Sequence, residues 1–87
     1  MGKINVELFG PFREFGIGIE LQADDKLTFN ELMTRLEKEL GGAFRERALK
    51  KNTTYILNKQ VVREDALEAI RISPGDRFAF ALIVGGG

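Results

Sequence analysis

Hydrophobic and polar residues alternate along the two opening stretches of the chain, residues 3–9 and residues 16–21. In both, apolar side chains recur at every second position: Ile4, Val6 and Leu8, then Ile17, Ile19 and Leu21. A period of two predicts a β-strand with one buried face. Because Gly10-Pro11 separates the stretches, we expect a hairpin whose loop is longer than a tight turn.

A helical pattern follows the hairpin. Thr28 and Glu31 form a capping-box sequence, in which each side chain can bond to the backbone N–H of the other. The next apolar residues have helical spacing and would form one stripe: Phe29, Leu32, Met33, Leu36 and Leu40. Gly41-Gly42 supplies the stop, so the sequence predicts one amphipathic helix between these signals.

The middle of the chain is less regular. Residues 44–52 carry alternating charges around Ala48 and Leu49, and we expect a short helical turn or a loop there. Residues 55–57 and 60–62 are expected to form two short strands. They would be joined at Asn58-Lys59, where Asn58 can adopt a positive φ.

The last part of the chain alternates again. Leu67, Ile70 and Ile72 are expected to close the end of the core. Pro74-Gly75 predicts a turn. In residues 77–84 the large and the small apolar side chains then alternate: Phe78, Phe80 and Leu82 against Ala79, Ala81 and Ile83. This pattern predicts a last strand with the phenylalanines toward the core.

The order of elements is β-β-α-β-β-β, with strongly apolar first and last strands. This order predicts an α+β protein of the β-grasp class, with a mixed sheet of about five strands and one main helix packed on one face. We expect both terminal strands to lie centrally in the sheet. Residues 1–84 would form one domain, followed by a flexible glycine tail at residues 85–87.

Composition removes several classes of function. The 87 residues contain no cysteine and no histidine, which excludes a disulfide framework, a zinc–thiolate site and a thiol nucleophile, and we expect no metal site. Thirteen basic and thirteen acidic residues cancel without a basic stripe, so nucleic-acid binding is not expected. No apolar run reaches membrane-spanning length and no signal-peptide core is present, so we expect a cytoplasmic protein.

The chain stops at Gly85-Gly86-Gly87, directly after the last apolar run. Glycine has no Cβ, so such a tail can pass through a slot too narrow for other residues. The candidate reactive group is therefore the carboxylate of Gly87, with Gly85 and Gly86 as the threading tether. The alternative is a frayed end or a leftover linker.

Three motifs give the chain a family resemblance over essentially its whole length: residues 6–14 (Val-Glu-Leu-Phe-Gly-Pro-Phe-Arg-Glu), 57–61 (Leu-Asn-Lys-Gln-Val) and 74–78 (Pro-Gly-Asp-Arg-Phe). Together with the terminal glycines, their order resembles the MoaD/ThiS family of ubiquitin-like sulfur carriers. The small subunit of molybdopterin synthase is the member that the chain resembles most. The chain has Lys59 where glycine is common in that family, and Leu82-Ile83 where a Pro-Pro pair is frequent.

The resemblance implies a chemistry carried out by partners. An activating enzyme of the ubiquitin-activating type, an adenylyltransferase, would use ATP to join AMP to the Gly87 carboxylate. A sulfur donor protein would then give a thiocarboxylate, and the large subunit of molybdopterin synthase would receive the tail. The chain itself would bind no cofactor and would not be a catalyst alone. A thiazole-type carrier, a protein modifier and a plain interaction domain remain alternatives.

A partner-binding surface is expected beside the tail, formed by residues on the outer side of the last strand and in the first loop: Phe9, Ala79, Ala81, Ile83 and Val84. The alternative for the strand residues is a second, minor packing layer. Phe12 is expected to cap the core. Arg13 and Glu14 are interpreted as solvated loop charges.

Overall fold

The computed structural model describes residues 2–50 and 52–82. Five strands form one mixed sheet in the order β2-β1-β7-β4-β5. Their bounds are Gly2–Leu8 (β1), Gly18–Ala23 (β2), Thr53–Leu57 (β4), Gln60–Val62 (β5) and Arg77–Leu82 (β7). β1 and β7 pair in parallel at the centre, and the other pairs are antiparallel. The expected central position of the first and last strands is confirmed.

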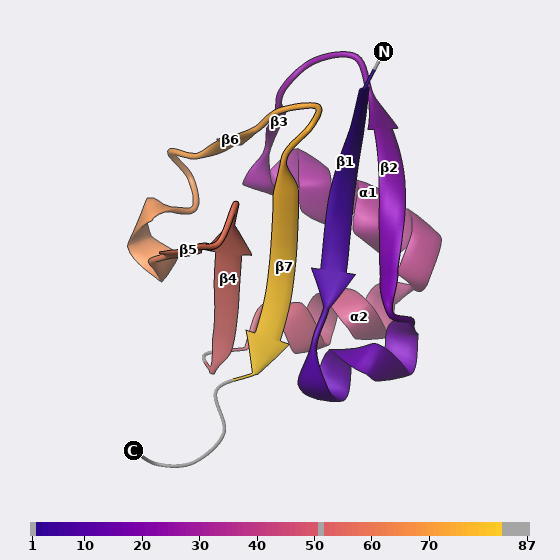
Figure 1. The fold of residues 1–87 in the computed structure, drawn as a ribbon. Helices are drawn as coiled ribbons and strands as arrows, with labels where there is room; N and C mark the ends of the chain where they lie inside the picture. Colours follow the sequence, from indigo (N-terminus) through magenta and orange to yellow (C-terminus); the bar gives the residue numbers. More distant parts are fainter. Residues whose placement is uncertain (1, 51, 83–87) are drawn as a thin grey trace.

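Two helices cover one face of this sheet (Figure 1). They are α1, Phe29–Leu40, and α2, Gly42–Ala48. Short 3-10 helices, η1 (Gly10–Phe15) and η2 (Glu64–Ala66), occupy two connections. The strands β3, Leu27–Thr28, and β6, Arg71–Ile72, pair as a small second sheet. The β-grasp architecture is confirmed, with a second helix beside the expected main one.

The start and stop of α1 follow from local chemistry. The Thr28 hydroxyl accepts from the Glu31 backbone N–H at 3.0 Å, and the Thr28 N–H donates to the Glu31 carboxylate at 2.9 Å. Gly41 ends the helix with φ 100°, a value that residues with a Cβ rarely adopt. The capping box predicted from the sequence is therefore present.

Aromatic rings fill the space between the helices and the sheet. The rings of Phe12, Phe44, Phe78 and Phe80 are fully buried. The ring of Phe44 packs edge to face on Phe80, with ring centroids 5.2 Å apart. The same ring packs edge to face on Phe12, with centroids 6.1 Å apart. Such geometry adds about 0.5–1.5 kcal/mol per pair beyond the burial of area. The predicted core positions of Phe12, Phe78 and Phe80 are confirmed.

The segment after α1 is more regular than the charges of residues 44–52 indicate. α2 forms because Phe44 and Ala48, four residues apart, lie on one face and are both fully buried. Only two of the seven residues of this helix are buried, which is too few for a periodic signal in the sequence. Leu67 and Ile72 belong to the core and Ile70 packs against it, as expected.

One expected strand position is wrong. Ile17 was predicted to share the buried face with Ile19 and Leu21, yet its side chain is 80% exposed. Gly16 has φ 124° at the end of η1, and β2 begins only at Gly18. Ile17 therefore still lies in the connection, outside the strand whose alternation would have buried it.

Candidate functional site

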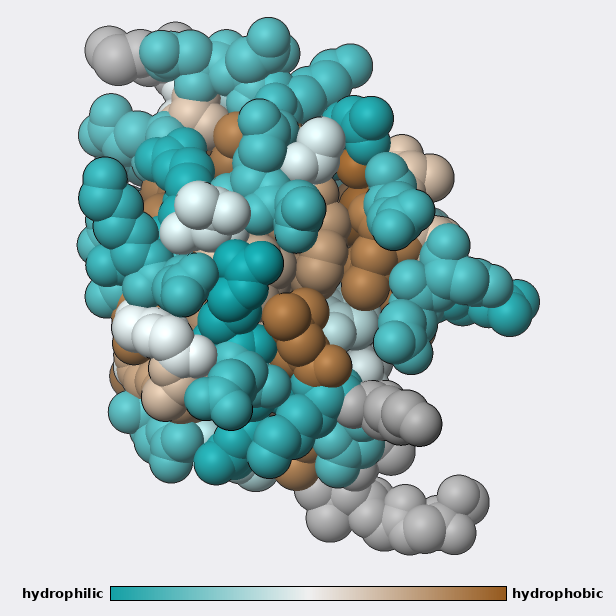
Figure 2. Space-filling model, turned by 180° about the vertical axis from the view of Figure 1, so that it is seen from behind, coloured by the Kyte–Doolittle hydropathy of each residue, from teal (hydrophilic) through white to brown (hydrophobic). Residues whose placement is uncertain are grey.

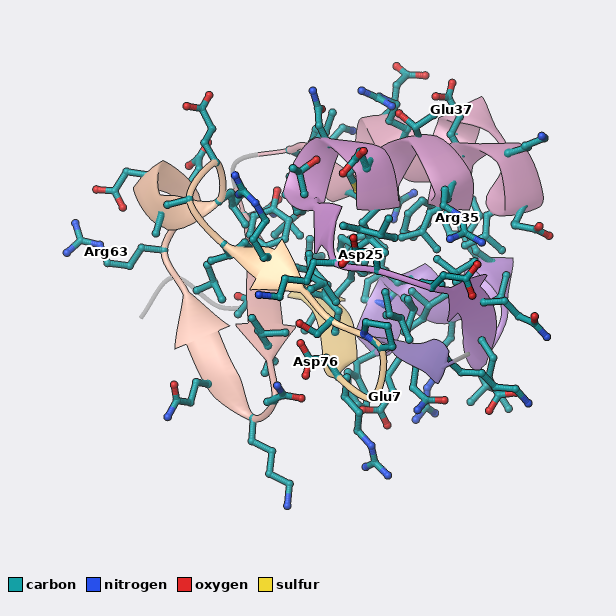
Figure 3. All side chains as sticks on the ribbon, turned by 90° about the horizontal axis from the view of Figure 1, so that it is seen from above. Glu7, Asp25, Arg35, Glu37, Arg63 and Asp76 are labelled. Atoms are coloured by element: carbon teal, nitrogen blue, oxygen red, sulfur yellow. The ribbon has the colours of Figure 1, made fainter. Side chains whose placement is uncertain are left out.

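The candidate site is the outer face of the five-stranded sheet, opposite the helices. Strand register aligns one residue from each strand across this face: Gly18, Glu7, Ala79, Ile56 and Val61. In Figure 3, Glu7 points away from the helix layer, whereas Glu37 comes from that layer. The face therefore has an apolar centre over β7 and β4, with a carboxylate on β1.

A hollow of about 290 Å³ lies over this centre. Its lining combines three apolar and three charged residues: Phe9, Ile56 and Ala79, with Glu7, Lys59 and Arg77. Two of the predicted partner-binding residues, Phe9 and Ala79, thus meet in one concave place. Phe9 is 39% exposed, so its ring is available for contact.

Ala79 differs from the expectation of a free docking residue. It lies on the outer face, as the alternation predicted, but only 5% of it is exposed. Its methyl group is smaller than the side chains of Phe9 and Ile56, which line the same hollow and are more exposed. Ala79 therefore forms the floor of the hollow, and contact with a partner falls to the residues around it.

The outer face continues toward the end of β7. Ala81 is half-buried and lies opposite Thr54 of β4. The Phe9 backbone N–H donates to the Phe80 carbonyl at 3.0 Å, which ties the first loop to this end of the strand. Within residues 2–50 and 52–82, the buried Thr54 Oγ1 has no hydrogen-bond partner. The half-buried methyl group of Ala81 and the unsatisfied hydroxyl of Thr54 thus lie opposite each other near the end of β7.

The remaining predicted site residues lie outside the described residues: Ile83, Val84, Gly85, Gly86 and Gly87. Their proposed roles in docking, threading and chemistry stay predictions. The last described residue of β7, Leu82, lies opposite Thr53 of β4, at one end of the two strands.

Two of the sequence motifs come together to set the position of β7. The side chain of Asn58 donates to the Asp76 carboxylate at 3.1 Å and accepts from the Arg77 backbone N–H at 2.8 Å. The second carboxylate oxygen of Asp76 accepts from the Ser73 N–H at 2.8 Å. We call this set of bonds the Asn58–Asp76 clasp. It joins the β4–β5 turn to the turn before β7, and so it holds the register of the last strand.

The β4–β5 turn has an unusual conformation for its sequence. Asn58 has φ 51° and Lys59 has φ 73°, as a two-residue type I′ turn requires. The expected positive φ of Asn58 is confirmed. A lysine at the second position is strained, because its Cβ crowds the backbone. Glycine would fit this turn position better. The lysine found there instead places a charged side chain at the lining of the hollow.

The first-loop charges lie apart from the hollow. Arg13 and Glu14 are exposed, and Glu14 pairs with Arg47 at 3.4 Å. The interpretation of both as loop charges therefore stands, with one surface ion pair added. Within the described residues, no group of three acidic side chains lies close enough to hold a metal ion. The helices in that part of the chain are too short and too polar to cross a membrane.

Sequence reasoning missed Ile56, Val61 and Thr54. Tyr55 is buried and donates to the Ala48 carbonyl at 2.6 Å, so alternation along β4 places Ile56 and Thr54 on the outer face. A two-residue turn then brings Val61 opposite Ile56. The alternation of side chains along β4 therefore predicts the outward position of Ile56 and Thr54 if Tyr55 faces the core.

Comparison with known proteins gives the family. The ThiS family model matches residues 6–87. Similar solved structures include the thiamine biosynthesis protein ThiS of Geobacter metallireducens, at 23% identity over 95% of this chain and 99% of that chain, with a TM-score of 0.58. The small archaeal modifier protein 1 of Methanosarcina acetivorans is 19% identical over 100% of this chain and 98% of that chain, with a TM-score of 0.70.

A further similar structure is the complex of subunits 1 and 2 of the molybdopterin-converting factor of Helicobacter pylori, at 20% identity over 98% of this chain and 99% of that chain, with a TM-score of 0.64. A search of the curated proteins found no match. At these identities the solved structures show a shared ubiquitin-like β-grasp fold, common to sulfur carriers and modifiers. Since the family model spans nearly the whole chain, the chain belongs to the ThiS family.

Proposed function

We propose that this chain is a sulfur carrier whose reactive group is the carboxylate of Gly87. The observation that carries the proposal is the family match, which extends through the three glycines at residues 85–87. Glycines leave a carboxylate sterically accessible, and the sequence contains no cysteine or histidine that could hold sulfur or act as a base. The catalytic groups would therefore come from partners, in the cytoplasm where ATP is available.

The proposed chemistry has two steps. In the first, the Gly87 carboxylate attacks the α-phosphate of ATP in an adenylyltransferase, forming an acyl-adenylate and releasing pyrophosphate. In the second, the terminal sulfur of a persulfide on the donor protein attacks the acyl carbon and displaces AMP, which forms an acyl disulfide. A thiol reductant then cleaves the S–S bond, which leaves the thiocarboxylate on Gly87 and a disulfide on the donor side. Activation is needed because a free carboxylate has no good leaving group. The thiocarboxylate is then nucleophilic at neutral pH.

The outer face is the proposed docking surface for these partners. Ordering three glycine residues costs about 1–2 kcal/mol each in backbone entropy, and glycine brings no side chain to offset that cost. The affinity must therefore come from the folded body. Phe9, Ile56 and Val61 supply apolar area on this face, and the hollow lined by Phe9 and Ile56 gives a shape for a partner to fill.

We place the carrier in molybdopterin synthesis, as the sulfur-donating small subunit beside a large synthase subunit. Two observations favour this branch: the motif at residues 9–14 and the similarity to a molybdopterin-converting factor that forms a complex of two subunits. A thiazole-type carrier has the same tail chemistry, and the ThiS family match supports it equally. A protein modifier would differ only after adenylation.

The experiment is an intact-mass measurement of the full chain after incubation with its activating enzyme, ATP and the sulfur donor. We expect one oxygen of the C-terminal peptide to be replaced by sulfur. A variant lacking Gly86 and Gly87 is the matched control and should show neither adenylate nor sulfur. Adenylation of this shortened chain would refute the proposed role of Gly87.

The branch is decided in a second reaction. Addition of the large synthase subunit and a pterin precursor should consume the thiocarboxylate and release the carboxylate form. Transfer only to a thiazole synthase would move the carrier to the thiamine branch. Isopeptide conjugates on lysines without any thiocarboxylate would establish the modifier function instead.

A further inference from the structure

A second cleft lies on a different side of the molecule from the outer face. It has a volume of about 480 Å³ and runs between the first turn of α1 and the segment around η2. Six residues line it: Thr28, Phe29, Asn30, Glu64, Leu67 and Glu68. Figure 2 views the helix side, where hydrophobic surface is visible between the helix layer and the segment that projects at the right.

The floor of this cleft is apolar. Phe29 and Leu67 are members of the core, with 9% and 7% of their surface exposed. The Phe29 ring packs edge to face on Tyr55, with centroids 5.3 Å apart, so it is held rigidly. A rigid apolar floor of which only a small part is exposed can contact the methylene groups of a long side chain.

The rim of the cleft is acidic. Glu64 and Glu68 are exposed, and within residues 2–50 and 52–82 neither carboxylate takes part in an ion pair. Burial is the larger cause of the raised pKa of Tyr55, and the negative charge of Glu64 is the second. The electrostatic field of Glu64 therefore reaches the Tyr55 ring, which packs against Phe29.

The nearby cations are held by other contacts than the two cleft carboxylates. Arg63 pairs with Asp65 at 3.4 Å, and in Figure 3 it points away from the body of the protein. The guanidinium of Arg71 donates to the carbonyls of Glu68 and Ile70, at 3.3 and 2.8 Å. The carboxylate of Glu31 is used in the capping box of α1. Among the six residues that line the cleft, the two charged ones, Glu64 and Glu68, are both negative.

From this combination we propose that the cleft binds a lysine or arginine side chain presented by a partner protein. The methylene groups would lie on Phe29 and Leu67, with the cationic head between Glu64 and Glu68. Charge complementarity selects this occupant, since an acidic or purely apolar segment would leave the two carboxylates repelled or desolvated. The cleft is separate from the hollow, with which it shares no lining residue.

The test is an NMR titration of the full chain with a capped Ala-Lys-Ala peptide, and in parallel with Ala-Arg-Ala and Ala-Gln-Ala. We expect saturable shifts of the Leu67 and Glu68 amide signals with one or both basic peptides and none with the glutamine peptide. The two basic arms decide which cation the cleft prefers. This inference does not depend on the sulfur chemistry, because the titration involves neither the tail nor a partner enzyme.

Matched variants complete the test. Glu64→Gln with Glu68→Gln removes two charges at the cleft, and it should weaken binding about tenfold, as the loss of two exposed ion pairs allows. Asp24→Asn with Asp25→Asn removes two charges from an exposed loop and should leave binding unchanged. Equal weakening by both double variants, unchanged binding after the glutamate substitutions, or no saturable shift would each overturn the proposal.

Discussion

The two faces of the sheet are built from the same strands but differ in residue size and in charge. On the helix side β7 presents Phe78 and Phe80, both fully buried in an aromatic cluster. On the outer side it presents Ala79 and Ala81, and Ala79 forms part of a hollow that charged residues also line. The comparison indicates that one face stabilises the fold, whereas the other leaves space for a partner. Substitutions on the helix side should therefore lower the stability of the fold, whereas substitutions on the outer side should lower the affinity for a partner.

The largest effect is expected from Phe78→Ala. This change removes a fully buried ring and leaves a cavity, so it should lower the free energy of unfolding by about 3–5 kcal/mol. Urea unfolding measures the loss. Val61→Ala on the outer face is the control, since Val61 is 68% exposed and its truncation should change stability by no more than about 0.5 kcal/mol. Similar losses in both variants would abolish the distinction between the faces.

Ala81→Arg tests the outer face itself. Ala81 lies on the outer face opposite Thr54, where a long side chain can extend into solvent, so the folded state should lose little stability. In a complex that covers this face, a buried unpaired cation would cost on the order of 3–5 kcal/mol of binding to the activating enzyme. Calorimetric titration of the enzyme measures the binding. Ala43→Arg places the same charge on the exposed surface of α2 and should bind normally. If Ala81→Arg binds as tightly as this control, the docking surface lies elsewhere.

Tyr55→Phe examines the polar bond of the buried face. Loss of the 2.6 Å bond from the Tyr55 hydroxyl to the Ala48 carbonyl should cost about 1 kcal/mol. Burial, aided by the Glu64 carboxylate, raises the pKa of Tyr55 above its ordinary value of 10.0. The folded state therefore keeps its proton where the unfolded state loses it, so stability is full below pH 10 and falls as the pH rises further.

Because Tyr55 is the single tyrosine, ultraviolet absorbance of tyrosinate follows this group alone. We expect the wild-type absorbance change to follow alkaline unfolding measured by circular dichroism. Tyr55→Phe should lose this source of alkaline sensitivity. Tyrosinate formation at the ordinary pKa in a folded protein would contradict the burial of the hydroxyl.

The smallest effect is expected from Lys59→Gly. Glycine relieves the strain of φ 73° but adds freedom to the unfolded chain, so the net gain in stability should be below about 1 kcal/mol. Because Lys59 lines the hollow, its removal should weaken binding of the activating enzyme. Melting curves and the same calorimetric titration test the two effects. Unchanged binding together with higher stability would show that the lysine has no role in recognition.

Much of the fold could be predicted because its signals are local. The capping box of Thr28 and Glu31 and the alternation of Phe78 and Phe80 each depend on residues close in sequence. α2 was underestimated because the burial of Phe44 depends on Phe12 and Phe80, which are distant in the chain. A contact between residues that are distant in the chain produces no periodic pattern within a segment of seven residues.

The candidate site was only partly predictable for the same reason. Alternation placed Ala79 on the correct face, but its burial depends on Phe9 from the first loop and Ile56 from β4. The Asn58–Asp76 clasp likewise joins residues 18 positions apart, and their two motifs carry no sign that they would meet. Register across strands, rather than the pattern within one strand, decides which residues form the site.

The parallel pairing of β1 and β7 has a mechanical consequence. The start of β1 and the end of β7 lie at opposite ends of the sheet (Figure 1). A force that pulls these two ends apart acts along neighbouring strands in opposite directions, so it loads all the hydrogen bonds between them together, in shear. Bonds loaded together resist far more than bonds opened one after another. A partner that grips the chain beyond Leu82 can therefore pull on the protein without unzipping its sheet.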